Sequence, residues 1–175
     1  MRNLASGLAL LACATIATAL PGHAADPVIG TAAMQMADGK DAGSATVTAV
    51  PNGLLVSGDF KNLPAGELAF HIHETGQCAP DFEAAGEHLN PNGREHGFYN
   101  PEGYHAGDMP NITVADDGTA TVEMFNTQID ADAVSDLFDD DGAALIVHAT
   151  ADTYEGDADF GDRVACGVIE PSSGQ

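Results

Sequence analysis

Short runs in which apolar and polar residues alternate make up most of the chain after residue 28. The first three runs are separated by the turn pairs Asp38-Gly39 and Asn52-Gly53, and the third ends before Pro64-Ala65-Gly66. Alternation over a few residues, bounded by such turn residues, is typical of antiparallel strands. The sequence therefore predicts about eight strands, at residues 29–36, 45–50, 54–60, 67–73, 111–114, 119–125, 143–148 and 164–169.

Eight short strands joined by turns predict an all-β fold, an eight-stranded antiparallel sandwich or barrel. Asp116-Asp117-Gly118 predicts a hairpin between the strands at 111–114 and 119–125, and residues 130–138 are expected to hold one helical turn. Residues 74–110 are rich in Gly, Pro, Asn and His and show no strand pattern. So long an irregular segment inside a compact domain is usually functional.

Composition narrows the class of protein. The chain has 175 residues, of which 44% are hydrophobic, so one folded domain is expected. It carries 5 Lys and Arg against 27 Asp and Glu, a formal net charge of −22. Nucleic acids and anionic membrane faces need clustered positive charge, so neither is an expected partner.

The first residues have the pattern of an export signal. A basic start at Met1-Arg2-Asn3 precedes an apolar run over 8–20, then Pro21 and small residues up to Ala25. We interpret residues 1–24 as a signal peptide and 25–175 as the mature domain, periplasmic or secreted. The apolar run is too short for a convincing membrane span. Acylation at Cys13, in Leu10-Leu11-Ala12-Cys13, is the alternative that would anchor the chain to lipid.

Histidines are concentrated where the irregular segment meets the strands. His71 and His73 lie two apart on one predicted strand and so share a face, and His148 ends another strand. Asp108 follows His105 by three residues. Neutral imidazole is the commonest metal ligand; four imidazoles suit copper, and three imidazoles with a carboxylate suit zinc.

Two cysteines remain once the leader is set aside, Cys78 and Cys166. Two distant cysteines in an exported chain predict one disulfide, and a pair of buried free thiols is the alternative.

Most of the histidines and the second cysteine lie in five short motifs. These are Phe70-His71-Ile72-His73-Glu74, Gly86-Glu87-His88-Leu89-Asn90-Pro91, His96-Gly97-Phe98, His105-Ala106-Gly107-Asp108 and Gly161-Asp162-Arg163-Val164-Ala165-Cys166-Gly167-Val168-Ile169. In these motifs the chain resembles the copper–zinc superoxide dismutase family in its exported bacterial form, and the resemblance covers roughly residues 29–170.

The resemblance implies a Greek-key fold with long metal-binding loops, and dismutation of superoxide anion to O2 and hydrogen peroxide with one copper and one zinc per chain. Copper would be held by His71, His73, His88 and His148, and zinc by His88, His96, His105 and Asp108. Arg163 and the bridging His88 would be the catalytic residues, and Cys78 and Cys166 would form the family's disulfide. Asp152 would link His71 to His96 from outside the metal sites.

Several rival interpretations stay open. The alternative role for Arg163 is structural, as a partner of Asp162 or of a loop carbonyl. The alternative role for Asp152 is to cap a turn. An exported protein that stores or passes copper and zinc without turnover is the alternative function. A sandwich that binds a partner through its acidic face would leave the histidines unexplained. Monomer and homodimer are both compatible with the sequence.

The loop between His148 and Arg163 carries four carboxylates and no lysine. They are Glu155, Asp157, Asp159 and Asp162. Because so acidic a protein repels superoxide at long range, we predict weak electrostatic steering. Arg94 is a second candidate for steering, with a plain surface charge as its rival interpretation. Glu74, Glu83 and Glu87 are expected to be solvated loop charges.

Overall fold

The protein is described by a computed structural model over residues 28–130 and 133–172. The predicted signal peptide and Cys13 lie outside these residues. The described part forms ten strands and two short 3-10 helices. In chain order they are β1 (Val28–Met36), β2 (Asp41–Val50), β3 (Gly53–Phe60), β4 (Gly66–Leu68), β5 (Phe70–His73), η1 (Phe82–Ala85), β6 (Ile112–Val114), β7 (Ala120–Asn126), η2 (Ala133–Leu137), β8 (Ala144–His148), β9 (Arg163–Val168) and β10 (Glu170–Pro171).

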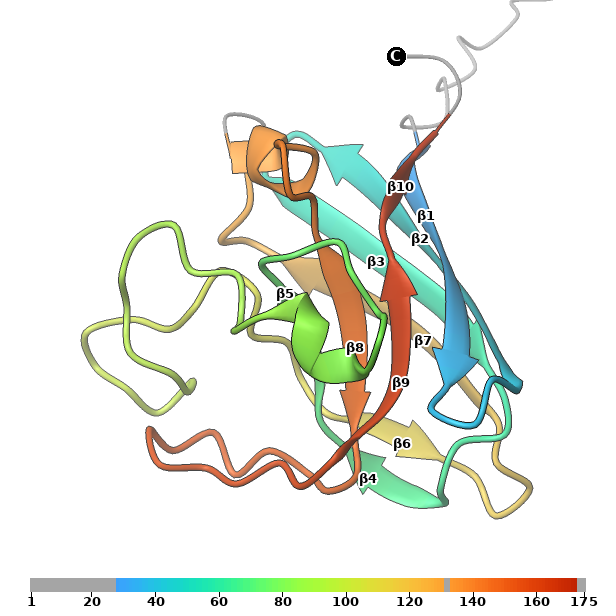
Figure 1. The fold of residues 1–175 in the computed structure, drawn as a ribbon. Helices are drawn as coiled ribbons and strands as arrows, with labels where there is room; N and C mark the ends of the chain where they lie inside the picture. Colours follow the sequence, from blue (N-terminus) through green and yellow to red (C-terminus); the bar gives the residue numbers. More distant parts are fainter. Residues whose placement is uncertain (1–27, 131–132, 173–175) are drawn as a thin grey trace, which may run out of the picture.

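Eight strands form one curled antiparallel sheet (Figure 1) in the order β5-β8-β9-β1-β2-β3-β7, with β10 paired to β1. The first three strands follow one another as a meander, and β9 returns along a long path to pair beside β1. Long connections of this kind, between strands that are neighbours in the sheet but distant in sequence, are found in Greek-key folds. The all-β antiparallel fold predicted from the sequence is therefore confirmed.

Two details of the strand prediction are wrong. The run at 67–73 is two strands, because the chain changes partners at Ala69: β4 pairs with β6 in a separate two-stranded sheet, and β5 pairs with β8. The predicted hairpin also has other partners. Its turn closes, with the Ala115 amide donating to the Thr119 carbonyl, but β7 pairs along the whole of Leu54–Phe60 in the neighbouring strand β3.

Among the remaining elements, the sequence predicts η2 but neither η1 nor β10. The helical turn expected at 130–138 is the 3-10 helix η2, and residues 131–132 lie outside the described part. Between β5 and β6, η1 is the only regular element among the described residues. No described helix has the length and apolar character that crossing a membrane requires.

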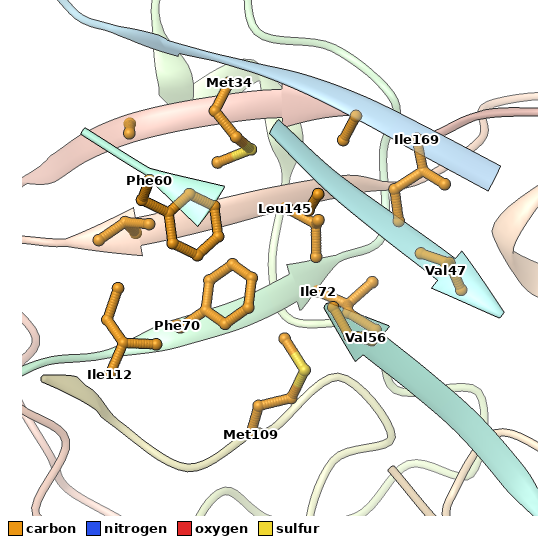
Figure 2. Packing of buried hydrophobic residues seen from close by; sticks show 14 of the residues in the cluster. Met34, Val47, Val56, Phe60, Phe70, Ile72, Met109, Ile112, Leu145 and Ile169 are labelled. Atoms are coloured by element: carbon orange, nitrogen blue, oxygen red, sulfur yellow. The ribbon is translucent and has the colours of Figure 1, made fainter. Parts of the chain in front are cut away.

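The core lies inside the curled sheet (Figure 2). Phe70 and Ile72 of β5 pack there with Leu145 of β8, and the rings of Phe60 and Phe70 meet edge to face at 5.4 Å. Burying each such side chain contributes about 1.5–3 kcal/mol. Because side chains alternate along a strand, this burial turns His71 and His73 to the opposite face of the sheet.

A second, smaller apolar cluster lies on that opposite face. Ile146 of β8 and Cys166 of β9 are buried there against Ala85 and Phe82 of η1. Cys78 and Cys166 form a disulfide that joins residues 88 apart in sequence, which confirms the predicted bond. The disulfide and the cluster together hold η1 against the outer face of the sheet.

Candidate metal centre

Three of the histidines come from neighbouring strands. His71 and His73 lie on β5, which pairs with β8, and His148 is the last residue of β8. Their exposed fractions are only 0%, 1% and 3%. Since the residues of opposite parity pack in the core, the three imidazoles point to the face that the long loops cover.

Two parts of the irregular segment 74–110, around His88 and around Asp108, pair with the free edge of β5. The Ile72 amide donates to the Gly107 carbonyl, and the Leu89 amide donates to the Ile72 carbonyl, both at 2.9 Å. A Cβ at Gly107 would lie 2.1 Å from the Ile72 carbonyl oxygen, so only glycine permits this approach. These bonds place His88 beside His73 and Asp108 beside His71.

Four histidines form the first of two clusters, the four-histidine group. One ring nitrogen from each lies within 4.8 Å of the others; the members are His71, His73, His88 and His148. Nδ1 of His71, Nε2 of His73 and both ring nitrogens of His148 are buried without a hydrogen-bond partner among the described residues. Buried polar atoms nearly always have one. Converging, unpartnered imidazole nitrogens fit a copper ion.

The second cluster, the three-histidine–aspartate group, comprises His88, His96, His105 and Asp108. Asp108 lies at its centre, with its carboxylate oxygens 2.8 Å from Nδ1 of His88 and 3.0 Å from Nδ1 of His96. Nδ1 of His105 lies 3.4 Å from Nδ1 of His88. Three nitrogens and one carboxylate converging in this way match a tetrahedral zinc site. Since Nδ1 of His88 faces this group, its Nε2 is left for the four-histidine group.

Asp152 contacts one histidine of each group and so connects the four-histidine group to the three-histidine–aspartate group. Its Oδ2 lies 3.2 Å from Nε2 of His71 and 3.1 Å from Nε2 of His96. These are the ring nitrogens that do not face the clusters, so the carboxylate fixes the orientation of both rings. The loop itself is held by Asn111, whose side chain accepts from the Asp152 amide and donates to the Asp152 carbonyl.

Tyr154 is a residue that sequence reasoning missed. Its amide donates to Oδ1 of Asp152, and its hydroxyl accepts from the Asn111 amide at 2.9 Å. Its ring stacks on Phe98 at 5.0 Å, and its φ of 63° lies in the left-handed region that side chains other than glycine rarely adopt. Tyr154 thus joins the loop of Asp152 to the segment that carries His96.

Burial keeps the imidazoles of His71, His73 and His148 neutral. It lowers the pKa of His71 to about 4, of His148 to about 3 and of His73 to about 2. Neutral rings are the form that binds a metal. For Asp108, burial opposes ionisation, but hydrogen bonds from His105, His88 and His96 outweigh it and hold the pKa of the carboxyl well below its usual range.

Arg163 stands directly opposite His148 in the pairing of β8 with β9. Its Nη1 donates to the Phe82 carbonyl at 2.8 Å, and its Nη2 lies 3.4 Å from Oε2 of Glu83. After burial, the positive charge of Arg163 is one of the causes that lower the pKa of His73 and His148, so its field reaches the cluster. The loop carbonyl considered as a structural partner is therefore present, at Phe82.

Glu83 and Arg94, the other two charged residues considered from the sequence, make different contacts. Glu83, expected to be a solvated loop charge, is 75% exposed yet contacts Arg163. Arg94 donates from Nη1 to the Glu102 carbonyl, within its own loop.

Phe160 forms an aromatic cover that sequence reasoning also missed. Its ring centroid lies 5.0 Å from His71, 5.3 Å from His88, 4.9 Å from His96 and 5.2 Å from His148. It also lines a pocket of about 160 Å³ beside His88, His96 and His105. The apolar ring of Phe160 therefore covers part of the imidazole of His88, the residue that belongs to both groups.

Comparisons with known proteins agree with this geometry. The family model for copper/zinc superoxide dismutase (SODC) matches residues 41–169. Superoxide dismutase [Cu-Zn] 2 of Aquifex aeolicus is 39% identical over 175 residues, covering 97% of this chain and 98% of the relative.

Two solved structures are similar as well. A SOD-like protein from Bacillus subtilis is 36% identical with a TM-score of 0.74, covering 80% of this chain and 97% of the other. The Cu/Zn superoxide dismutase from Brucella abortus is 29% identical with a TM-score of 0.69, covering 80% and 98%. The family model matches most of the chain, and the donor sets of the two clusters suit copper and zinc. The chain belongs to the copper/zinc superoxide dismutase family, an enzyme family whose cofactors are copper and zinc.

Proposed function

We propose that this protein dismutates superoxide at a copper site that His88 bridges to a zinc site. The observation that carries the proposal is the place of His88 in both metal-ligating groups, with Nδ1 turned to Asp108 and Nε2 left for the histidines of β5 and β8. A ring shared in this way would couple the two ions through one side chain.

The ligand assignment follows the two groups. His71, His73, His88 and His148 would hold copper, and His88, His96, His105 and Asp108 would hold zinc. When bound, copper supplies the one-electron couple by which one superoxide is oxidised to O2 and a second, with two protons, is reduced to hydrogen peroxide, while zinc has no redox states. Asp152 keeps the rings of His71 and His96 oriented.

Arg163 and His88 act on the substrate. The guanidinium, held by the Phe82 carbonyl at 2.8 Å, supplies a fixed cation beside His148 that attracts superoxide and donates hydrogen bonds to it. Nε2 of His88 is the atom that we assign to deliver a proton to the reduced product. Phe160, packed on the ring of His88, limits the water that competes with this transfer.

We also propose that the protein is exported to a periplasmic or extracellular compartment after removal of residues 1–24. The Cys78–Cys166 disulfide supports this proposal, because such bonds persist in oxidising compartments. Mass spectrometry of the exported protein tests it: a chain beginning at Ala25 agrees, and an acylated Cys13 would indicate the lipid-anchored form instead.

Measuring kcat/KM for superoxide with the copper- and zinc-loaded protein tests the proposed activity. Arg163→Gln is expected to lower kcat/KM by about tenfold or more, because it removes a preorganised cation beside the reacting anion. Arg94→Gln, which removes the same charge at a loop carbonyl, should change it less than about twofold. Full loading with both metals but no turnover would instead support the storage or transfer function.

A further inference from the structure

We propose that Glu83 restrains Arg163: its carboxylate competes with the substrate anion for the guanidinium and so sets how tightly the site takes up anions. The proposal rests on the anion-binding role assigned to Arg163 above. Neither the spacing of the motifs nor the ligand geometry requires a carboxylate at this position.

The contact is direct and lies on the anion-binding group itself. Oε2 of Glu83 is 3.4 Å from Nη2 of Arg163, and only 12% of the Arg163 side chain is exposed. A carboxylate and superoxide are both monoanions, and both accept hydrogen bonds from guanidinium N–H groups. Any donor of Arg163 directed to Glu83 is therefore not available to the substrate.

The position of Glu83 is fixed by the fold rather than by the ion pair. Phe82 and Glu83 are the first two residues of η1, and Phe82 packs in the cluster around Cys166. The Cys78–Cys166 disulfide ties the segment before η1 to β9, three residues from Arg163. The carbonyl of Phe82 and the carboxylate of Glu83 thus approach the guanidinium from the same short helix.

The two contacts on Arg163 have different strengths. The Phe82 carbonyl accepts from Nη1 at 2.8 Å, which is good hydrogen-bond geometry, and it remains when the carboxylate is removed. The Glu83 side chain is 75% exposed, and an ion pair so open to water is weak. An arriving anion can therefore displace Glu83, while the guanidinium stays in place on Phe82.

Azide titration of the copper- and zinc-loaded protein, followed by the visible absorption of copper, tests the proposal without measuring turnover. In Glu83→Gln the dissociation constant for azide is expected to fall by about twofold to fivefold, the range for a partly exposed ion pair. The value of kcat/KM for superoxide at low ionic strength should rise by a similar factor.

Two controls separate the ion pair from a general change of charge. Glu67→Gln removes the same charge from an exposed position on β4 and should leave the azide affinity unchanged. In the Arg163→Gln background, Glu83→Gln should have no effect, because a double-mutant cycle reports only their mutual interaction. An unchanged or weaker azide affinity in Glu83→Gln, or an equal gain in Glu67→Gln, would overturn the proposal.

The azide titration and the dismutation assay together distinguish a failure of the Glu83 restraint from a failure of the proposed dismutase function. If the loaded protein shows no dismutation but Glu83→Gln still tightens azide binding, the restraint is supported and the dismutase function is not. If the protein dismutates superoxide and Arg163→Gln slows it, while Glu83→Gln leaves the azide affinity as it was, only the restraint is rejected.

Discussion

Oδ2 of Asp152 lies 3.2 Å from Nε2 of His71, on the side of the imidazole ring that faces away from the four-histidine group. The contact leaves Nδ1 of His71 buried without a partner among the described residues. The same carboxylate holds His96 of the other group. One side chain outside both sites therefore sets the orientation of a ring in each.

Removal of this carboxylate should weaken metal binding while the fold persists. We expect Asp152→Ala to lower the affinity for zinc by roughly 10- to 100-fold, the usual effect of losing a partner that orients a ligating histidine. Competition with a chromogenic zinc chelator measures the change. Asp157→Ala, which removes an exposed carboxylate from the same loop, should leave the affinity as it is. Equal zinc affinity in the two variants would contradict the role of Asp152.

Acidification should destabilise the metal-free protein. Burial lowers the folded-state pKa of His71 to about 4, of His148 to about 3 and of His73 to about 2. In the unfolded chain these rings take up protons below about pH 6.5, so the unfolded state gains protons that the folded state does not. Stability is then lost as the pH falls below about 6.5, by up to about 2 kcal/mol per histidine at about pH 5.

His96 opposes part of this loss. Burial lowers its pKa, but the hydrogen bonds with Asp108 and Asp152 outweigh burial and raise the pKa to about 9. Its contribution is fully present below about pH 6.5 and is lost as the pH rises through about 9. Urea unfolding of the metal-free protein at several pH values measures the sum. A free energy of unfolding that stays flat between neutral pH and about pH 5 would contradict the buried, neutral state of His71, His73 and His148.

Loss of the disulfide should reduce both stability and anion binding. The double variant Cys78→Ser, Cys166→Ser is expected to unfold with a free energy lower by about 2–5 kcal/mol, the usual effect of removing such a bond. Because the disulfide holds the segment leading to η1, Arg163 should also lose its fixed carbonyl partner. Urea unfolding and azide titration measure the two effects. A variant as stable as the parent would show that the apolar cluster around Ile146 suffices to hold η1.

Electrostatic steering should be weak. The net charge of −22 repels superoxide at long range, and Arg163 acts only locally, with one carboxylate already beside it. We expect kcat/KM to change by less than about threefold as ionic strength rises through the range in which surface charges become screened. Stopped-flow measurement of superoxide decay at increasing salt tests this prediction. A steep fall would mean that an attractive field extends well beyond Arg163.

The sequence predicts the site better than it predicts the strand pairing. Alternation along β5 and β8 places His71, His73 and His148 on the face opposite Phe70, Ile72 and Leu145, and the structure has this arrangement. The pairing of β4 with β6 is not predictable in this way, because alternation says which face a side chain takes but not which edge its strand joins. A turn signal at Asp117-Gly118 likewise fixes a reversal, not the partners of the strands beside it.

Contacts made by the loops are the other part that sequence reasoning misses. Phe160 covers four histidine rings and Glu83 reaches Arg163, although both belong to segments without periodicity. Glu83 is placed by η1 and by the disulfide, and the carbonyl of Phe160 accepts a hydrogen bond from the Thr150 amide. A pattern read along the chain carries no information about such contacts.

Metal analysis of the purified protein, paired with a superoxide dismutation assay, tests the central claim most directly. We predict close to one copper and one zinc per chain, with activity lost when copper is removed and restored when copper is returned. His88→Ala should disturb the binding of both metals, because its ring belongs to both groups. A protein that takes up neither metal, or one that keeps its full activity without copper, would contradict the bridged copper–zinc site.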